Sequence, residues 1–210
     1  MRPIILIGGG GHCMSVIDAA ISAGFLIKGI LDLPTEVGKF VCGIPILGTD
    51  EEISEYANDC DFVVTLGFIK NATLRIKLHD KIRALGGHLG TVIASTAHVS
   101  QFAEIGEGTV ILHHANVNAG AKIGIGCIIN TSANIEHSVV VGDYVHISTG
   151  VMVNGDSTVG ARTFVGSCTV VNNGKFICDD CIVGAGSVVC KNIIVPGIYA
   201  GTPARLMKNV

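Results

Sequence analysis

The sequence predicts an α/β domain followed by a parallel β-helix, and two observations lead to that prediction. A Val or Ile recurs at every sixth position from Val99 to Val195 without a miss. Ahead of this repeat, apolar runs of strand length alternate with helical patterns and glycine turns. We therefore expect residues 1–93 to form the first domain, and residues 94–210 to form the second with a cap at its C-terminal end.

The six-residue period excludes a helix face and fits a short strand followed by a corner. A helical apolar stripe recurs at three and four residues, whereas period-two alternation plus a bend gives six. The residue two before each aliphatic position is usually small, as at Ala115, Ala121 and Cys127, and the residue after it is often Gly or Asn. Gly and Asn tolerate left-handed backbone angles at a corner. Stacked units of this kind form a parallel β-helix, although an inert solenoid spacer would show the same pattern.

Composition and charge narrow the classes of function. The formal net charge is −3 and no Lys/Arg cluster is present, which argues against a nucleic-acid surface. No apolar run approaches the roughly 18 residues of a membrane span, and the N-terminus lacks a signal peptide's basic start. We expect a cytoplasmic protein that binds neither nucleic acid nor a membrane.

The cysteines and the paired histidines give no sign of a metal site. The eight cysteines are irregularly spaced, so we expect free thiols. Cys178 and Cys181 form a lone C-x-x-C, and the hexad register predicts that their side chains face different ways. His113 and His114 are adjacent in the sequence and are expected to face opposite ways, in a structural role or at a trimer axis. No motif surrounds His79.

The chain begins with the pattern of a nucleotide-binding unit. Residues 3–7 are a short apolar run, which we expect to be a strand, and four glycines from Gly8 to Gly11 follow it. Apolar residues between positions 16 and 21 then predict a helix. In such units phosphate meets the backbone N–H groups at the helix N-terminus. The third glycine of the dinucleotide fingerprint is absent, because Cys13 stands in its place.

Strands and helices alternate over the rest of the first domain. We expect strands at residues 25–31 and 62–66, a helix at 51–57 capped by Thr49 or Asp50, and a helix at 73–85 closed by glycines. This order implies a three-layer domain with its ligand at the carboxyl ends of the strands. His12, Asp32 and Gly67 are expected to meet there. Asp32 either holds a ribose hydroxyl or begins the turn that Leu33-Pro34 completes.

The G-G-G-G-H turn, the small α/β domain and the hexad solenoid resemble the NeuD/PglD family of bacterial sugar acetyltransferases over essentially the whole chain. The most specific part is the run from Ile129 to His137, which continues through His146-Ile147-Ser148 to Asn154-Gly155-Asp156. The resemblance implies a Rossmann-like domain that holds a sugar nucleotide and a left-handed β-helix that holds acetyl-CoA. The chain departs from the family at Cys13-Met14-Ser15 and at Ser138, where an acid often follows the catalytic histidine.

The hexad register selects His137 as the candidate base. Acetyl transfer from a thioester needs a base for the acceptor and a donor for the tetrahedral oxyanion. His137 lies at a corner and points out of the solenoid. The resemblance implies three hexads per coil, so Gly155, eighteen residues later, would stack one coil away, about 4.8 Å along the axis. The resemblance implies that the Gly155 N–H lies near the thioester carbonyl. Glu136 either orients or charges the imidazole, or is an exposed corner carboxylate.

The resemblance also implies contacts to both substrates. Ser167 and Ala185 share one corner edge, where a pantetheine arm would run, and His146 lies either beside the coenzyme or in a subunit contact. The expected acetyl-CoA contacts are His146, Gly155, Ser167 and Ala185. The expected substrate contacts are Gly10, Gly11, His12, Asp32 and Gly67. The β-helices are expected to form a homotrimer with active sites between subunits.

The predicted activity is acetyl-CoA-dependent acetylation of a sugar in surface polysaccharide or glycan synthesis. A sialic-acid hydroxyl is slightly favoured, because Asn154-Gly155-Asp156 and residues 164–172 look closer to that branch of the family. N-acetylation of a UDP- or GDP-linked 4-amino-6-deoxy sugar is the strong competitor, since both reactions use the same base and thioester. A non-catalytic scaffold or regulator of a sugar-synthesis enzyme is the alternative of a different class.

Overall fold

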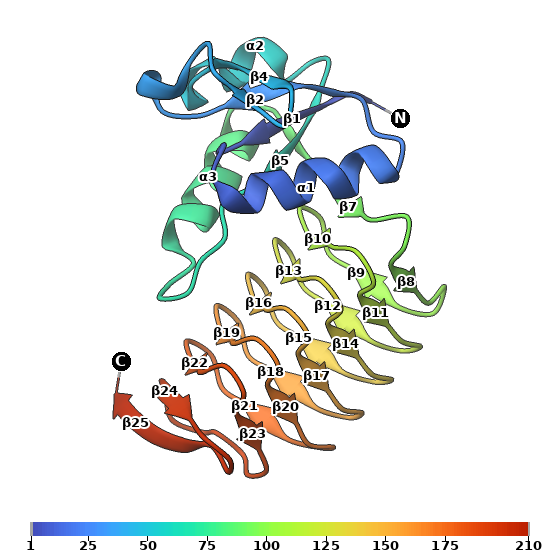
Figure 1. Ribbon diagram of the computed structural model, residues 1–210, viewed down its shortest axis with the longest axis vertical. Coiled ribbons are helices and arrows are strands. Elements are labelled where there is room, and N and C mark those ends of the chain that lie inside the picture. The colour runs from blue at the N-terminus through green and yellow to red at the C-terminus, as the bar shows by residue number, and fades with distance from the viewer. Residues whose placement is uncertain (1, 210) are drawn as a thin grey trace.

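Figure 1 shows the computed structural model of the chain, in which residues 2–209 are described. An α/β domain, drawn in blue to green, sits at one end of a solenoid that runs from green to red. The predicted fold class, an α/β domain followed by a parallel β-helix, is confirmed. Among residues 2–209, no helix combines the length and the apolar character that crossing a bilayer requires.

The first domain is built on a six-stranded sheet in the order β3-β4-β2-β1-β5-β6. All neighbouring pairs are parallel except β3 with β4. The sequence predicted the inner strands β1, β2 and β5, whereas the inner strand β4 and the short edge strands β3 and β6 were not anticipated. The strands are β1 (Ile4–Ile7), β2 (Ile27–Leu31), β3 (Phe40–Val41), β4 (Ile44–Gly48), β5 (Asp61–Val64) and β6 (His88–Leu89).

Helices cover both faces of this sheet, as the alternating apolar pattern requires. Helix α1 (Gly11–Ser22) packs on one face, and α2 (Ile53–Tyr56) and α3 (Thr73–Ala84) pack on the other. The helix predicted at residues 51–57 is shorter than expected. A 3-10 turn, η2 (Asp50–Glu52), precedes α2, and Thr49 caps it in a reciprocal pair of hydrogen bonds with Glu52. A second 3-10 turn, η1 (Pro34–Glu36), follows β2.

The solenoid has three faces, each a parallel sheet of two-residue strands. Face 1 contains β7 (Val92–Ile93), β10 (Val110–Ile111), β13 (Ile128–Ile129), β16 (His146–Ile147), β19 (Phe164–Val165) and β22 (Ile182–Val183). Face 2 contains β8 (His98–Val99), β11 (Asn116–Val117), β14 (Asn134–Ile135), β17 (Met152–Val153), β20 (Val170–Val171) and β23 (Val188–Val189). Face 3 contains β9 (Glu104–Ile105), β12 (Lys122–Ile123), β15 (Val140–Val141), β18 (Thr158–Val159) and β21 (Phe176–Ile177).

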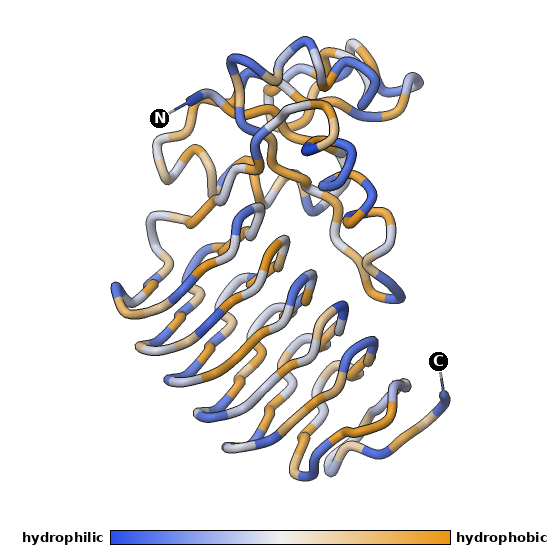
Figure 2. Tube along the Cα trace, turned by 180° about the vertical axis from the view of Figure 1, so that it is seen from behind, coloured by the Kyte–Doolittle hydropathy of each residue, from blue (hydrophilic) through white to orange (hydrophobic). Residues whose placement is uncertain are grey.

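We name the corners edge 1–2, edge 2–3 and edge 3–1 after the faces that they join. The second residue of most strands points inward and forms a continuous aliphatic core. Figure 2 shows the result as hydrophobic segments that recur along every coil. Strand β7 already pairs with β10, so the solenoid begins at Val92. The boundary between residues 93 and 94 stays a prediction.

The hexad pattern fails in its last unit. Val195 was expected to point inward, but its side chain is 49% exposed, whereas Ile193 is buried and bridges to Ile177. Ile193 comes sixteen residues after its partner instead of eighteen, so the final corner is shorter and Val195 falls outside the core. The chain then forms the cap, in which β24 (Gly197–Ala200) extends face 1 and β25 (Arg205–Asn209) pairs antiparallel with it.

A buried arginine joins the two domains. The Arg75 side chain is 1% exposed and donates to the carbonyl oxygens of Val64 (2.6 Å) and Leu66 (3.1 Å) in the α/β domain. It also donates to the carbonyl oxygens of Gly126 (2.7 Å) and Gly108 (3.2 Å) on edge 3–1. Burial lowers the pKa of Arg75 to about 10. The docking of the α/β domain therefore depends on a cation whose partners are backbone carbonyls.

Candidate active site

His137 and Gly155 stack on edge 2–3, because strands β14 and β17 pair with a shift of one coil. The imidazole lies directly on the glycine. A Cβ atom built on Gly155 would fall 2.6 Å from His137 Cε1 and 2.7 Å from Nε2. A side chain at position 155 would displace the His137 ring, so the contact with this ring explains why the residue is glycine. The His137 side chain is exposed in the single chain.

Gly155 is buried, and the N–H groups on both sides of its own are used in hydrogen bonds. On either side of it, the Asn154 N–H donates to Val171 O at 3.0 Å and the Asp156 N–H donates to His137 O at 3.2 Å. Within residues 2–209, the Gly155 N–H has no partner. An exposed imidazole beside an unused backbone N–H is the pair of groups that acyl transfer requires.

Glu136 is held by amides rather than by the histidine. Its carboxylate accepts hydrogen bonds at 2.9 Å from the Nδ2 groups of Asn134 and Asn118, and Asn116 in turn donates to Asn134 at 2.7 Å. These bonds, led by that from Asn134, hold the pKa of Glu136 below its usual value. In the described part of the chain, no hydrogen bond joins the Glu136 carboxylate to the His137 ring. In this structure, Glu136 can therefore act on His137 only through its negative charge, and not through a hydrogen bond that orients the ring.

A second site lies where the α/β domain meets face 1. Gly10, Gly11, His12, Gly67 and His146 line one cleft of about 590 Å³. The ring centroids of His12 and His146 are 6.3 Å apart. His12 and Gly67 therefore meet as predicted.

Asp32 lies behind the glycine turn, outside this cleft. Its carboxylate accepts from the Gly9 N–H at 2.7 Å and from the Leu33 N–H at 2.8 Å. The second bond fits the alternative that Asp32 begins a turn, and the first shows that it also fixes the glycine turn. Contact with a ribose stays a prediction.

His146 points out of the solenoid, but the α/β domain covers it and leaves it 8% exposed. Its Nδ1 lies 2.8 Å from the Phe68 carbonyl oxygen, and its Nε2 lies 3.3 Å from the Asn130 amide nitrogen. Burial lowers the pKa of His146 to about 4 and that of His12 to about 3. Both rings are therefore neutral near pH 7, with His146 donating through Nδ1 to the carbonyl.

The four glycines of the turn have different reasons to be glycine. Gly8 has a φ of +99°, and a Cβ at Gly9 would meet the Asp32 carboxylate at 2.8 Å, so the fold itself requires both. At Gly10 and Gly11 an added Cβ would meet no atom within 4 Å. Among the described residues, no side chain caps the N-terminus of α1. The open space and the uncapped N–H groups form a place for an anion.

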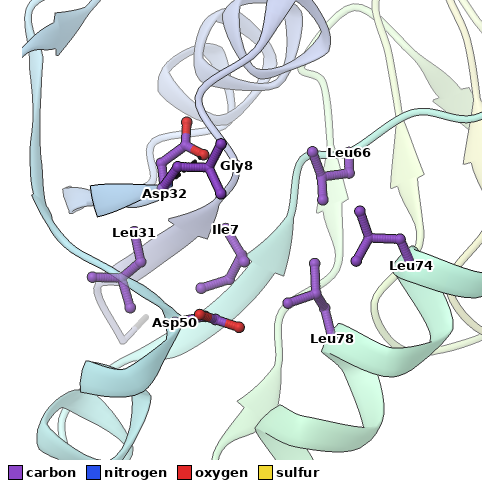
Figure 3. Close-up of a pocket in the computed structure, with 9 residues that line it drawn as sticks. Ile7, Gly8, Leu31, Asp32, Asp50, Leu66, Leu74 and Leu78 are labelled. Atoms are coloured by element: carbon purple, nitrogen blue, oxygen red, sulfur yellow. Dashed lines mark hydrogen bonds between the residues drawn. The ribbon is translucent and has the colours of Figure 1, made fainter. Parts of the chain in front are cut away.

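An apolar pocket of about 130 Å³ lies on the opposite side of the turn, at the carboxyl ends of β1, β2 and β5. Figure 3 shows Leu74 and Leu78 of α3 facing the strand ends, with the carboxylates of Asp32 and Asp50 beside them. Leu66 lines both this pocket and the cleft that contains His146. Sequence reasoning missed these leucines, because a leucine on a helix or after a strand has no distinctive spacing.

The residues predicted to bind acetyl-CoA lie on different parts of the solenoid. Gly155 is on edge 2–3, Ser167 and Ala185 are on edge 1–2, and His146 is on face 1. Face 2 separates the two edges. Ser167 Oγ is 2.9 Å from Ser148 Oγ on the same edge. One chain alone does not bring these residues together.

No metal centre forms among residues 2–209, where no group of three His, Cys, Asp or Glu side chains is arranged to hold an ion. The expectation that Cys178 and Cys181 face different ways was wrong. Their sulfur atoms are 3.5 Å apart, because Cys178 packs against the core from its corner.

Comparison with known proteins identifies relatives of both domains. Residues 3–82 match the PglD N-terminal domain family. The whole chain superposes on perosamine N-acetyltransferase from Caulobacter crescentus, in a histidine-to-asparagine variant in complex with CoA and GDP-perosamine. The TM-score is 0.92 and the identity 30%, over 100% of this chain and 98% of that one.

Two further matches differ in how much they cover. The acetyltransferase domain of PglB from Neisseria gonorrhoeae, in complex with acetyl coenzyme A, superposes with a TM-score of 0.91 at 29% identity, over 98% of this chain and 99% of that one. The uncharacterized protein L142 of Acanthamoeba polyphaga mimivirus is 31% identical over 107 residues. This match covers 50% of the present chain and only 20% of the viral protein.

Proposed function

Because this chain belongs to the NeuD/PglD family of left-handed β-helix sugar acetyltransferases, we propose that it transfers the acetyl group of acetyl-CoA to the amino group of a nucleotide-linked sugar. The observation that carries the proposal is the His137 ring seated on Gly155, whose N–H is unused. The complexes of the two superposed enzymes with CoA, GDP-perosamine or acetyl-CoA support this pair of substrates.

The proposed chemistry follows from these two groups. The His137 imidazole removes a proton from the acceptor amine as its nitrogen attacks the thioester carbonyl carbon. The Gly155 N–H stabilises the resulting oxyanion. The tetrahedral intermediate collapses with cleavage of the C–S bond, and the departing CoA thiolate takes the proton from the imidazolium. The products are an N-acetyl sugar and CoA with a free thiol.

The α/β domain would hold the nucleotide. The leucine-lined pocket of Figure 3 suits the face of a base, and the uncapped N-terminus of α1 suits a diphosphate. Gly10 and Gly11 leave room there for the phosphates. Leu66 links this pocket to the cleft of His12 and His146, so the sugar would leave the diphosphate toward the solenoid.

The site would be completed by a second subunit. Edges 1–2 and 2–3 both border face 2, so a homotrimer with face 2 toward its axis would bring edge 2–3 of one chain beside edge 1–2 of the next. Acetyl-CoA would then lie between Ser167 and Ala185 of one chain and His137 of the partner subunit. Separation of the predicted contacts onto two edges of one chain supports this arrangement.

O-acetylation of a sialic acid, and the role of a non-catalytic scaffold, stay predictions that the same assay tests. The assay measures CoA release from acetyl-CoA with free sialic acid, CMP-sialic acid, and UDP- and GDP-linked 4-amino-6-deoxy sugars. We expect turnover with an amino sugar, and we expect His137→Ala to lower the rate by about 10²- to 10⁴-fold while acetyl-CoA still binds. Turnover with sialic acid alone, or an unchanged rate in the variant, would contradict the proposal.

A further inference from the structure

Two cysteines face one another across a corner of edge 3–1 at the capped end of the solenoid. Cys178 follows β21 and Cys181 precedes β22, so the two residues flank the turn that joins face 3 to face 1. Their sulfur atoms lie 3.5 Å apart. Cys181 is fully buried in the aliphatic core, and Cys178 packs against this core from the corner. The two thiols are therefore in contact, and the core shields them on one side.

The position of Cys178 in the repeat makes its side chain unusual. In the four preceding coils the same position is a glycine, namely Gly106, Gly124, Gly142 and Gly160. A Cβ atom there would collide with the next coil, as at Gly142, where it would lie 2.7 Å from the Ala161 backbone nitrogen. The corner above Cys178 differs, because residues 194–197 do not form the turn of the earlier corners. Cys178 is thus the first residue at this position that carries a side chain, and its sulfur contacts Cys181.

The backbone of the corner already suits a disulfide. Residues 178–181 form a four-residue turn, in which the first and last Cα atoms lie less than about 7 Å apart. Asp180 in this turn has a φ of 58°, close to the 57° of Arg162 one coil earlier, so the stacking of coils sets the turn. A disulfide needs Cα atoms about 4.4–6.8 Å apart and sulfur atoms about 2.05 Å apart. Rotation of the two side chains supplies the remaining approach of the sulfur atoms.

The C-terminal cap is built on this corner. The Cys178 N–H donates to the Ile193 carbonyl oxygen at 2.9 Å, and Cys181 Sγ lies 3.9 Å from the Val195 carbonyl oxygen. Tyr199 of β24 packs against the same core cluster as both cysteines. Strand β24 then pairs with β22, which begins directly after Cys181. A covalent bond across the corner would therefore fix the surface against which the cap packs (Figure 1).

We propose that Cys178 and Cys181 form a reversible disulfide, which fastens the corner of the solenoid that supports the C-terminal cap. The pair lies on edge 3–1, whereas the proposed active site lies on edges 1–2 and 2–3 and at the junction with the α/β domain. The inference is therefore independent of the proposed function. The oxidant is a small-molecule disulfide, for which glutathione disulfide is the probe.

The two thiols react in a fixed order, because only one of them is accessible. Cys181 is buried and burial raises its pKa, so Cys178, which is half-buried, attacks the external disulfide. The Cys178 thiolate bonds to one sulfur of glutathione disulfide, and one glutathione leaves. Cys181 then loses its proton, attacks Cys178 Sγ and displaces the second glutathione. Two protein thiols are oxidised, one glutathione disulfide is reduced, and the two protons pass to the released glutathione thiolates.

The test treats the folded chain with glutathione disulfide, alkylates the remaining thiols with iodoacetamide in denaturant, and determines peptide masses. Residues 176–191 form one tryptic peptide, which contains Cys178, Cys181 and the exposed Cys190. We expect this peptide to lose two hydrogen atoms and to be modified at Cys190 alone. Dithiothreitol should restore alkylation at all three cysteines.

The variants assign the bond to its two sulfur atoms. Cys178→Ser should abolish the disulfide, whereas Cys190→Ser, the matched control in the same peptide, should leave it intact. Because Cys181 is buried, Cys181→Ala is the second variant, since it removes the thiol without burying a hydroxyl. Free thiols at both positions 178 and 181 of the treated wild type would overturn the proposal. A disulfide in this peptide that persists in Cys178→Ser would also overturn it.

Stability measures whether the disulfide fastens the cap. The urea midpoint of the oxidised wild type should rise by about 0.5 M or more, because the cross-link restricts the unfolded chain. The rise should disappear with dithiothreitol and be absent in Cys178→Ser. An unchanged or lowered midpoint in chains that have formed the disulfide would refute its role in fastening the cap.

Discussion

Edge 2–3 of the solenoid and the junction between the domains both contain histidines, but they use their polar groups differently. At the junction, the Arg75 guanidinium donates hydrogen bonds to backbone carbonyl oxygens. The His146 Nδ1 atom bonds to the Phe68 carbonyl oxygen, and its Nε2 atom faces the Asn130 side chain. At edge 2–3, His137 is exposed and the neighbouring Gly155 N–H has no partner within residues 2–209. Arg75 and His146 thus use their polar groups within the chain, whereas the edge leaves the His137 ring exposed and, in the described part of the chain, the Gly155 N–H unused.

Because of this difference, we expect the junction to determine mainly the stability of the fold and edge 2–3 to determine mainly the rate of turnover. A polar group with buried internal partners contributes mainly to folding, because its removal leaves those partners unsatisfied. A group that is exposed in the folded chain contributes little to folding and is free to act on a substrate. Substitutions at the junction should therefore change the free energy of unfolding, and substitutions at edge 2–3 should change the rate of acetyl transfer.

The largest expected effect is on stability, in Arg75→Met. The substitution leaves up to four carbonyl groups without their donor, and we expect a loss of about 3–5 kcal/mol in the free energy of unfolding. The control is Arg83→Met, which removes a partly exposed pair with Glu107 at 2.8 Å and is expected to cost at most about 1 kcal/mol. Urea unfolding measures both, and similar costs would refute the contrast.

The next effect is on the rate, in Gly155→Ala. The added Cβ overlaps the His137 ring, so we expect the turnover number to fall by about 10²- to 10³-fold while the urea midpoint changes little. The substitution is also made in a His137→Ala background, where no ring remains to displace. If the loss acts through the ring, the glycine substitution should have a much smaller effect there. Additive losses would show that Gly155 acts independently of His137.

The arrangement at edge 2–3 could be predicted from the sequence far better than the arrangement at the junction between the domains. The hexad repeat fixes the register, and the family resemblance adds three hexads per coil, so together they predict that His137 stacks on Gly155, eighteen residues later. The repeat failed only at Val195, where the last corner is shorter. The period predicts this stacking because each coil contacts mainly the coils directly before and after it.

The junction could not be predicted in the same way. The contacts of Arg75 with Gly108 and Gly126, and that of Asp18 with His113, join segments with no shared period. The signal for Arg75 was weak, because an arginine on a helix is usually exposed. Asp32 illustrates the limit of local reasoning, since its bond to the turn was foreseen as an alternative but its bond to Gly9 was not.

A smaller effect distinguishes the junction from edge 2–3 by pH. His79 of α3 is fully buried at the junction, where its ring lies against Gly108 and Gly126. Burial lowers the pKa of His79 to about 3, below the ordinary value of about 6.5 that the unfolded chain has. The unfolded state therefore binds more protons between these values, so stability falls as the pH drops from about 6.5 toward 3 and is fully present above 6.5. Each such histidine contributes a slope of about 1.4 kcal/mol per pH unit. In His79→Phe, urea midpoints between pH 7 and pH 4 should decline less steeply, and an unchanged slope would contradict this assignment.

The smallest expected effect on stability lies in the glycine turn, where the two kinds of region meet. Gly8→Ala should destabilise the protein by about 1–3 kcal/mol, because its φ of +99° and its contact with Leu66 are unsuited to a side chain. Gly10→Ala should change stability by less than about 0.5 kcal/mol, since its Cβ would meet no atom of residues 2–209 within 4 Å. It should nevertheless raise KM for the nucleotide sugar and leave KM for acetyl-CoA unchanged. A stability cost in Gly10→Ala equal to that of Gly8→Ala would mean that the fold, and not a ligand, requires both glycines.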